Sequence, residues 1–264
     1  MIELSPDAFR AVTPLFDGVD HSIALVHAVI EGSSPGRVFA DRVDAPSCAY
    51  LVHEGAFHYV GGNAAHRGFH QAMLSLIFDD VLCWREEQEL VLFAFSDAWR
   101  EKLDGLLGAR GAKRIHRRMF AFSPPRFQAH AGWRERLPEG IRLRNIDEQL
   151  AERSADFRPL VDPGTKRFGV CVMVGGEIAS VSSAVAVARG EAEIDIHTVQ
   201  KHRRHGYAML AACAFIEESL ARGLTPNWSC WPERQASCAL AKKLGFESEP
   251  DVPAHLLSEA HVIG

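Results

Sequence analysis

The chain of 264 residues is long enough for one large domain or for two of roughly 130 residues each. Apolar residues make up 47% and charged residues 24%, which is the balance of a globular protein with a substantial core. The net charge of −5 argues against a general nucleic-acid or membrane-surface binder, and no apolar stretch approaches the ~20 residues of a membrane span. The N-terminus is acidic, and the six cysteines form no CxxC pair, so we expect a cytoplasmic α/β protein with reduced thiols.

The first half of the chain contains one clear strand–turn–helix pattern. It spans residues 58–74, and a second helix is predicted after Ser96, a typical N-cap residue. Residues 122–140 are rich in proline and glycine, which makes a regular element there improbable. We therefore expect two domains, residues 1–130 and 131–264.

The second half alternates strands and helices. Strands are predicted over residues 141–146, 168–174, 177–187, 192–199 and 224–231, with helices starting at Asp147 and spanning 207–222 and 233–243. Short glycine turns join the three middle strands, which must be antiparallel because a parallel return needs about a dozen residues or more.

The two halves repeat one pattern. Gly68 precedes Gly206 by 138 residues in similar turn–helix segments, and Gly108 precedes Gly245 by 137 residues in similar Leu-Gly helix ends. A nearly constant offset indicates a duplicated unit. The alternative is a pair of unrelated helices, each preceded by a glycine-rich turn.

Residues 198–210, where a strand meets the alanine-rich helix, carry the strongest functional signal. A helix start leaves four backbone N–H groups unpaired, and residues 202–208 contain no Ser, Thr, Asp or Asn to cap them. Gly206 permits close approach of a ligand, and residues 201–205 are all Lys, Arg or His. The pattern favours an anion site, and the alternative is a solvated basic loop.

At these residues the sequence resembles a known family. Arg203-x-x-Gly206-x-Ala208, directly after a strand ending in Val199, is similar to the [Q/R]-x-x-G-x-[G/A] signature of the GNAT superfamily of acyl-CoA-dependent N-acetyltransferases. The segment from Ser237 to Phe246 resembles the helix and Leu-Gly-Phe turn that close the family's fold. The resemblance covers roughly residues 141–250 and agrees with the predicted strand order.

The resemblance implies a GNAT-like α/β fold with a mixed sheet, preceded by a degenerate GNAT-like half. It also implies acetyl-CoA as the acyl donor, with the strand end pairing to the pantetheine arm and the loop amides wrapping the pyrophosphate. The implied cofactor residues are Thr198, Val199, Gln200, Arg203, Arg204, His205, Gly206, Tyr207, Ala208 and Ser237.

The pattern from Trp231 to Phe246 and the two-domain length resemble the zwittermicin-A resistance type of GNAT protein. This finer resemblance implies that the acceptor is a small amine or amino-polyol, a class that includes antibiotics. The chain departs from the family in two places. Arg234 stands where Asn often binds pantetheine, and Ala241 stands where a Tyr often protonates the leaving thiolate. A tyrosine general acid is therefore not expected.

The first half departs further from the family signature. Ala65 stands where the second half has Arg203, and the bulky His70 fills the small position of Ala208. Without a basic anchor, this half is expected not to bind coenzyme A, but to support the second half and to form a wall of the substrate site.

Three residues are candidates for the base that accepts a proton from the acceptor amine. Strand alternation puts Glu193, Asp195 and His197 on one face, opposite Ile194 and Ile196. Glu193 resembles in position the glutamate base of histone-acetylating GNAT enzymes, and His197 lies nearest the expected thioester. The alternative is that Asp195 and His197 form a structural pair or face solvent.

The sequence therefore predicts direct acetyl transfer to a small amine. The alternatives are a protein-lysine or N-terminal acetyltransferase and a non-catalytic acyl-CoA-binding sensor. No metal is expected, because His66 and His70 lack the Glu of an H-E-x-x-H motif. No nucleic-acid or membrane partner is expected, and the sequence leaves open whether the chain is a monomer or a homodimer.

Overall fold

The computed structural model describes residues 1–19, 21–53, 57–81 and 89–258. The chain divides into two compact units: residues 1–117 with the segment starting at Asp251, and residues 118–250. The sequence predicts a single boundary at residue 130, whereas the chain passes from the first unit to the second after residue 117 and returns to the first unit at Asp251. The proline-rich segment belongs to the second unit, because Phe127 and Trp133 are buried in its core although the prolines prevent long elements there.

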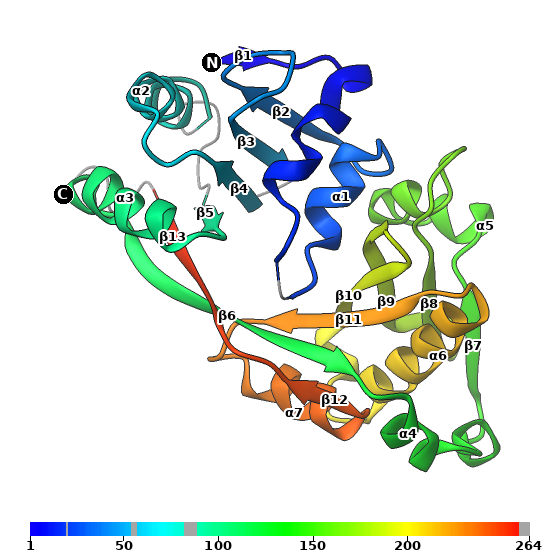
Figure 1. Cartoon of the computed structure of the whole chain (residues 1–264). Helices are drawn as coiled ribbons and strands as arrows, with labels where there is room; N and C mark the ends of the chain where they lie inside the picture. The colour runs from blue at the N-terminus through cyan, green and yellow to red at the C-terminus, as the bar shows by residue number, and fades with distance from the viewer. Residues whose placement is uncertain (20, 54–56, 82–88, 259–264) are drawn as a thin grey trace. The chain divides into compact units, whose positions relative to one another are not determined.

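The first unit is a mixed sheet with helices (Figure 1). Its elements are β1 (Ile2–Glu3), a 3-10 helix (Pro6–Leu15), α1 (Ala24–Ile30), β2 (Gly36–Ala40), β3 (Cys48–His53), β4 (Phe57–Gly62), α2 (Arg67–Ser75), β5 (Glu89–Ala94), α3 (Asp97–Leu107), the first half of β6 (Lys113–Phe122), and β13 (Val252–Ser258). The strand order is β1-β2-β3-β4-β5-β13-β6, and β4 and β5 run parallel. Apolar residues four apart give α3 one buried face, with Trp99, Leu103 and Leu107 inaccessible to solvent.

The second unit has its own mixed sheet. Its elements are the second half of β6, α4 (Pro124–Phe127), β7 (Ile141–Asn145), α5 (Glu148–Ala151), a 3-10 helix (Ala155–Leu160), β8 (Gly169–Val174), β9 (Glu177–Ala188), β10 (Glu191–Thr198), α6 (Tyr207–Ala221), β11 (Thr225–Cys230), α7 (Gln235–Lys243) and β12 (Phe246–Ser248). The strand order is β6-β11-β10-β9-β8-β7, and β12 pairs with β6.

The core of the second unit lies on both faces of this sheet. Helix α6 packs on β8, β9 and β10, and Phe215 from its buried face stacks on Phe168 with ring centroids 5.0 Å apart. On the other face, α5 and the neighbouring 3-10 helix cover Cys171 and Met173 of β8. The predicted antiparallel meander of β8, β9 and β10 is confirmed.

The two units share one plan, as the repeat predicted. In each, a parallel strand pair brackets a helix and a second helix follows: β4-α2-β5-α3 in the first and β10-α6-β11-α7 in the second. Strand β6 is divided between the units, and the last strand of the chain completes the first unit. Residues 118–122 of β6 pair with β11 and β12 in the second unit, while the C-terminal strand β13 pairs with β5 and with residues 113–117 of β6.

Both predicted helix caps are present. The Ser96 hydroxyl accepts a hydrogen bond from the Trp99 N–H, and the Asp147 carboxylate accepts one from the Leu150 N–H. Among the described residues no helix combines the length and the hydropathy that a membrane span requires.

Candidate acetyl-CoA site

The parallel strands β10 and β11 separate after a short stretch of pairing. Residues 191–193 of β10 pair with residues 225–227 of β11, and from Ile194 onward β10 pairs only with β9. Within the described residues, the last part of β10 therefore has no strand on its β11 side. A free strand edge of this kind can accept an extended ligand as an added strand.

At the end of β10 the chain turns into α6 without a side-chain cap. Gly206 is the N-cap residue, in the left-handed conformation with φ +82°, and it provides no side chain to cap the first-turn amides. A Cβ built at Gly206 meets nothing within 4 Å, so the space beside the helix start is open. Backbone donors, the helix dipole and open space together suit an anion.

The cations of the loop divide into two groups. Lys201 forms an ion pair with Glu177, the first residue of β9, and Lys201 lowers the pKa of the Glu177 carboxyl below its usual value. Arg203, Arg204 and His205 are exposed. The charge of Lys201 is therefore paired with a carboxylate, and Arg203 and Arg204 are exposed cations beside the helix start.

Further contacts fix the loop between β10 and α6. Arg203 Nε donates a hydrogen bond to the Thr198 carbonyl at 3.3 Å, and His205 Nδ1 donates to the Arg203 carbonyl at 2.8 Å. The His205 ring stacks on Tyr207, the first residue of α6, with centroids 5.5 Å apart. Arg204 has φ +68°, a conformation that L-residues adopt at a cost of about 1–2 kcal/mol. The loop therefore has a defined backbone path.

The three candidate bases differ in burial. Glu193 is 4% exposed, and its carboxylate accepts a hydrogen bond of 2.5 Å from the Ser229 hydroxyl of β11. Asp195 and His197 are exposed, whereas Ile194 packs in the core on the α6 side. Glu193 lies at the last β10–β11 pair, where the two strands separate.

The closing helix α7 carries the remaining predicted cofactor residue. The Ser237 hydroxyl accepts a hydrogen bond from the Trp228 indole N–H at 3.1 Å, which joins the first turn of α7 to β11. Arg234 is the N-cap residue of α7. Ala241 is fully buried in the core.

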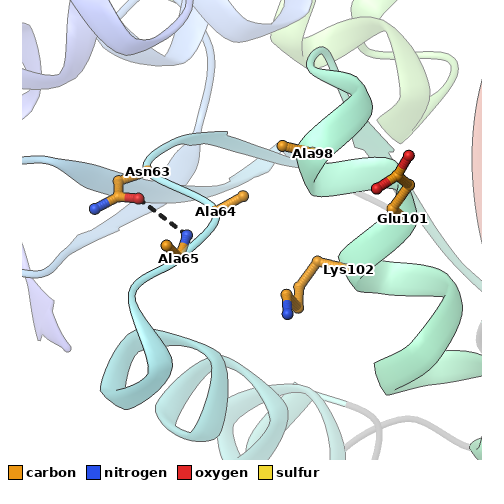
Figure 2. A pocket seen from close by; sticks show the side chains of 6 residues that line it. All are labelled: Asn63, Ala64, Ala65, Ala98, Glu101 and Lys102. Atoms are coloured by element: carbon orange, nitrogen blue, oxygen red, sulfur yellow. Dashed lines mark hydrogen bonds between the residues drawn. The ribbon is translucent and has the colours of Figure 1, made fainter.

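The corresponding loop of the first unit is arranged differently. Asn63 Oδ1 accepts the Ala65 N–H at 2.9 Å, and the His66 imidazole accepts the Phe69 N–H at 3.1 Å and so caps α2. Figure 2 shows this loop beside α3, where a cavity of about 550 Å³ is lined by Asn63, Ala64, Ala65, Ala98, Glu101 and Lys102. Here donors at the helix start are already bonded to side chains of the chain itself.

Two partners of the site were missed from the sequence. Ser229 bonds to Glu193, and Glu177 bonds to the loop lysine. The alternation of polar Asn227 and Ser229 with apolar Trp228 and Cys230 on β11 is the signal for the first of these. A pairing between a turn and a distant loop, such as Glu177 with Lys201, leaves no local pattern.

Comparison with known proteins identifies the family. The sequence profile described as "GNAT acetyltransferase" matches residues 13–254, which is most of the chain. The chain belongs to the GNAT acetyltransferase family. It is therefore an acyltransferase, and enzymes of this family use acetyl-CoA.

Relatives of this GNAT protein match it over nearly its whole length. The uncharacterized N-acetyltransferase YdfB of Bacillus subtilis (strain 168) is 26% identical over 255 residues, covering 93% of this chain and 94% of YdfB. A GCN5-related N-acetyltransferase-like protein from Streptococcus suis 89/1591 superposes with a TM-score of 0.68 at 22% identity, covering 94% of this chain and 98% of the other.

A tandem GNAT protein from the clavulanic acid biosynthesis pathway has a TM-score of 0.63 at 11% identity, covering 97% of each chain. At this identity the likeness concerns the fold alone. It agrees with the two-unit GNAT plan predicted from the repeat.

Proposed function

We propose that the chain transfers an acetyl group from acetyl-CoA directly to the amine of a small molecule or amino-polyol, a class that includes antibiotics. The observation that carries this proposal is the uncapped start of α6 at Gly206, beside exposed cations and the free edge of β10. The choice of a small acceptor rests on the resemblance to the zwittermicin-A resistance type.

The residues at the end of β10 and the start of α6 fit coenzyme A. Thr198, the last residue of β10, pairs with the pantetheine arm at the free strand edge. Val199 and Gln200 line the arm just beyond it, where the Val199 N–H bonds to the Ala179 carbonyl and Gln200 begins a 3-10 helix (Gln200–His202). The amides of Gly206, Tyr207 and Ala208 bind the pyrophosphate, where Gly206 leaves room for close approach. Arg203 and Arg204 add positive charge, and His205 lies beside them in the loop. Ser237 contacts the cofactor from α7.

The acceptor amine must lose a proton, because its free pKa of about 10 keeps it protonated at neutral pH. Glu193 is the first candidate to hold this proton, because its carboxylate is buried and oriented by Ser229 where β10 and β11 separate. Asp195 and His197 are the alternatives on the same face. The β10 N–H groups polarise the acetyl carbonyl. The leaving thiolate takes its proton from water, since Ala241 provides no acid.

The test is a turnover assay with the purified chain, acetyl-CoA and a panel of amines, following release of free thiol. We expect turnover with small amines or amino-polyols and none in the absence of an amine. Turnover confined to lysine peptides or protein N-termini would support a protein acetyltransferase instead.

A second candidate function is a non-catalytic acyl-CoA-binding sensor. The observation that favours it is Ala241, which is buried in the core. The family often has at this position a tyrosine that acts as the general acid. Saturable binding of acetyl-CoA without thiol release from any amine would support the sensor.

A further inference from the structure

Two cysteine sulfurs meet where β11 connects to α7. The Sγ atoms of Cys230 and Cys238 are 3.3 Å apart, and the two residues are 4% and 8% exposed. Cys230 ends β11, and Cys238 lies in the first turn of α7. The sulfurs must approach each other by only about 1.3 Å to reach the S–S bond length of about 2.05 Å.

The other described cysteines lie in different surroundings. The Cys48 sulfur contacts the Asn63 carbonyl at 3.2 Å, and the Cys171 sulfur lies 3.6 Å from the Met173 sulfur. Burial raises the pKa of both thiols, and it raises the pKa of Cys213 to about 12. These shifts disfavour the thiolate, which is the form of a thiol that attacks an oxidant. Cys83 lies outside the described residues.

We propose that Cys230 and Cys238 form a site of reversible oxidation, in which hydrogen peroxide converts the two thiols into a disulfide. One thiolate attacks peroxide, takes up one oxygen as a sulfenic acid and releases hydroxide, which is protonated to water. The second thiolate attacks the sulfenic sulfur, and the S–S bond forms as the S–O bond breaks and a second water leaves. Two thiols and one peroxide thus give one disulfide and two waters.

The disulfide would act on the neighbouring candidate cofactor site. Ser237 precedes Cys238, and its hydroxyl bonds to Trp228 of β11. Drawing Cys238 toward Cys230 shifts the first turn of α7, which carries Ser237, against β11. We expect oxidation to weaken the binding of acetyl-CoA. This consequence rests on the proposed function, whereas formation of the disulfide does not.

The experiment uses the full chain, reduced, desalted and treated with hydrogen peroxide. Remaining thiols are then alkylated under denaturing conditions, and the protein is digested with trypsin. Arg234 lies between the two cysteines, so trypsin separates them into two peptides unless a disulfide joins them. We expect the joined peptides, an intact mass lower by about 2 Da before alkylation, and reversal by dithiothreitol. Cys48→Ser should leave the bridge intact, and Cys230→Ser should abolish it.

Acetyl-CoA binding is measured by calorimetry on the reduced and oxidised forms. We expect the Kd to rise about threefold or more on oxidation, and to stay unchanged in peroxide-treated Cys230→Ser. If the two peptides of the peroxide-treated wild-type chain are not joined, the proposed disulfide is wrong. This result does not depend on the folding of any variant. A bridge with equal Kd values would overturn its effect on binding. Failure of the reduced form to bind acetyl-CoA would count against the proposed function, while the peptide masses would still decide the disulfide.

Discussion

Glu193 is the side chain on which the proposed chemistry depends most. Its substitution by Gln keeps an oxygen that accepts the hydrogen bond from Ser229, but removes the group that takes the proton. Since a positioned base contributes about 10²–10⁴-fold to rate, we expect Glu193→Gln to lower kcat by at least about 10²-fold with little change in the KM for acetyl-CoA.

Asp195→Asn and His197→Gln are the matched variants on the same face of β10. A large loss of kcat in either one, with Glu193→Gln unimpaired, would transfer the role of base to that residue. Full activity in all three variants would exclude a side-chain base on this face. Melting temperatures measured on the same samples separate loss of chemistry from loss of folding.

At the level of elements, the two ends of α6 offer a paired test of the anion site. Gly206 and Gly223 both have left-handed φ values, +82° and +71°, and a Cβ at either position meets nothing within 4 Å. Alanine at each site therefore carries a similar backbone penalty of about 1 kcal/mol. We expect Gly206→Ala to raise the Kd for acetyl-CoA about tenfold or more, because its methyl group stands where the pyrophosphate approaches. Gly223→Ala should bind like the wild type; equal Kd values for both variants would contradict the site.

Sequence periodicity located most elements of the second unit closely. Helix α6 was predicted over residues 207–222 and spans Tyr207–Ala221, and β10 was predicted over residues 192–199 and spans Glu191–Thr198. Their sequence patterns are strong because α6 is rich in apolar residues along its buried face, and β10 alternates apolar and polar residues. Strand β6 was missed, since Lys113, Arg114 and His116 give it no run of buried residues and part of it is exposed.

The candidate site was predictable only where its parts are local. The uncapped start of α6 and the cation cluster are contiguous in the sequence, and both are present in the structure. The separation of β10 from β11 and the bond between Ser229 and Glu193 depend on pairing between distant segments. Alternation places Ser229 on the polar face of β11, but no local pattern identifies Glu193 as its partner.

For the whole molecule, the first unit depends on the end of the chain, because β13 completes its sheet. Strand β13 lies between β5 and β6, and its Leu257 is fully buried in the first unit's core. We expect Leu257→Ala to lower the free energy of unfolding by about 2–5 kcal/mol in urea titrations. Leu220, which is 43% exposed on α6, is the matched control, and Leu220→Ala should stay within about 0.5 kcal/mol of the wild type. Equal stabilities of the two variants would mean that β13 contributes little.

The duplicated plan raises the question of how many cofactor sites one chain has. Each unit places a helix after the first strand of a parallel pair, which is where we propose the anion site of the second unit. In the first unit, however, His66 caps that helix, Asn63 bonds to the loop N–H of Ala65, and Ala65 replaces the basic Arg203. The cavity beside this loop is lined by Lys102 and also by Glu101, whose negative charge opposes the binding of an anion.

We therefore expect the full chain to bind one acetyl-CoA. An isolated 1–130 fragment cannot test this, because it lacks β13, so the measurement is calorimetric titration of the whole chain with acetyl-CoA. A stoichiometry of one is expected for the wild type. Gly206→Asp, which places a negative charge at the helix start, should abolish binding because the first unit cannot replace the lost site. Two equivalents in the wild type, or one equivalent left in Gly206→Asp, would show that the first unit binds the cofactor despite its capped helix.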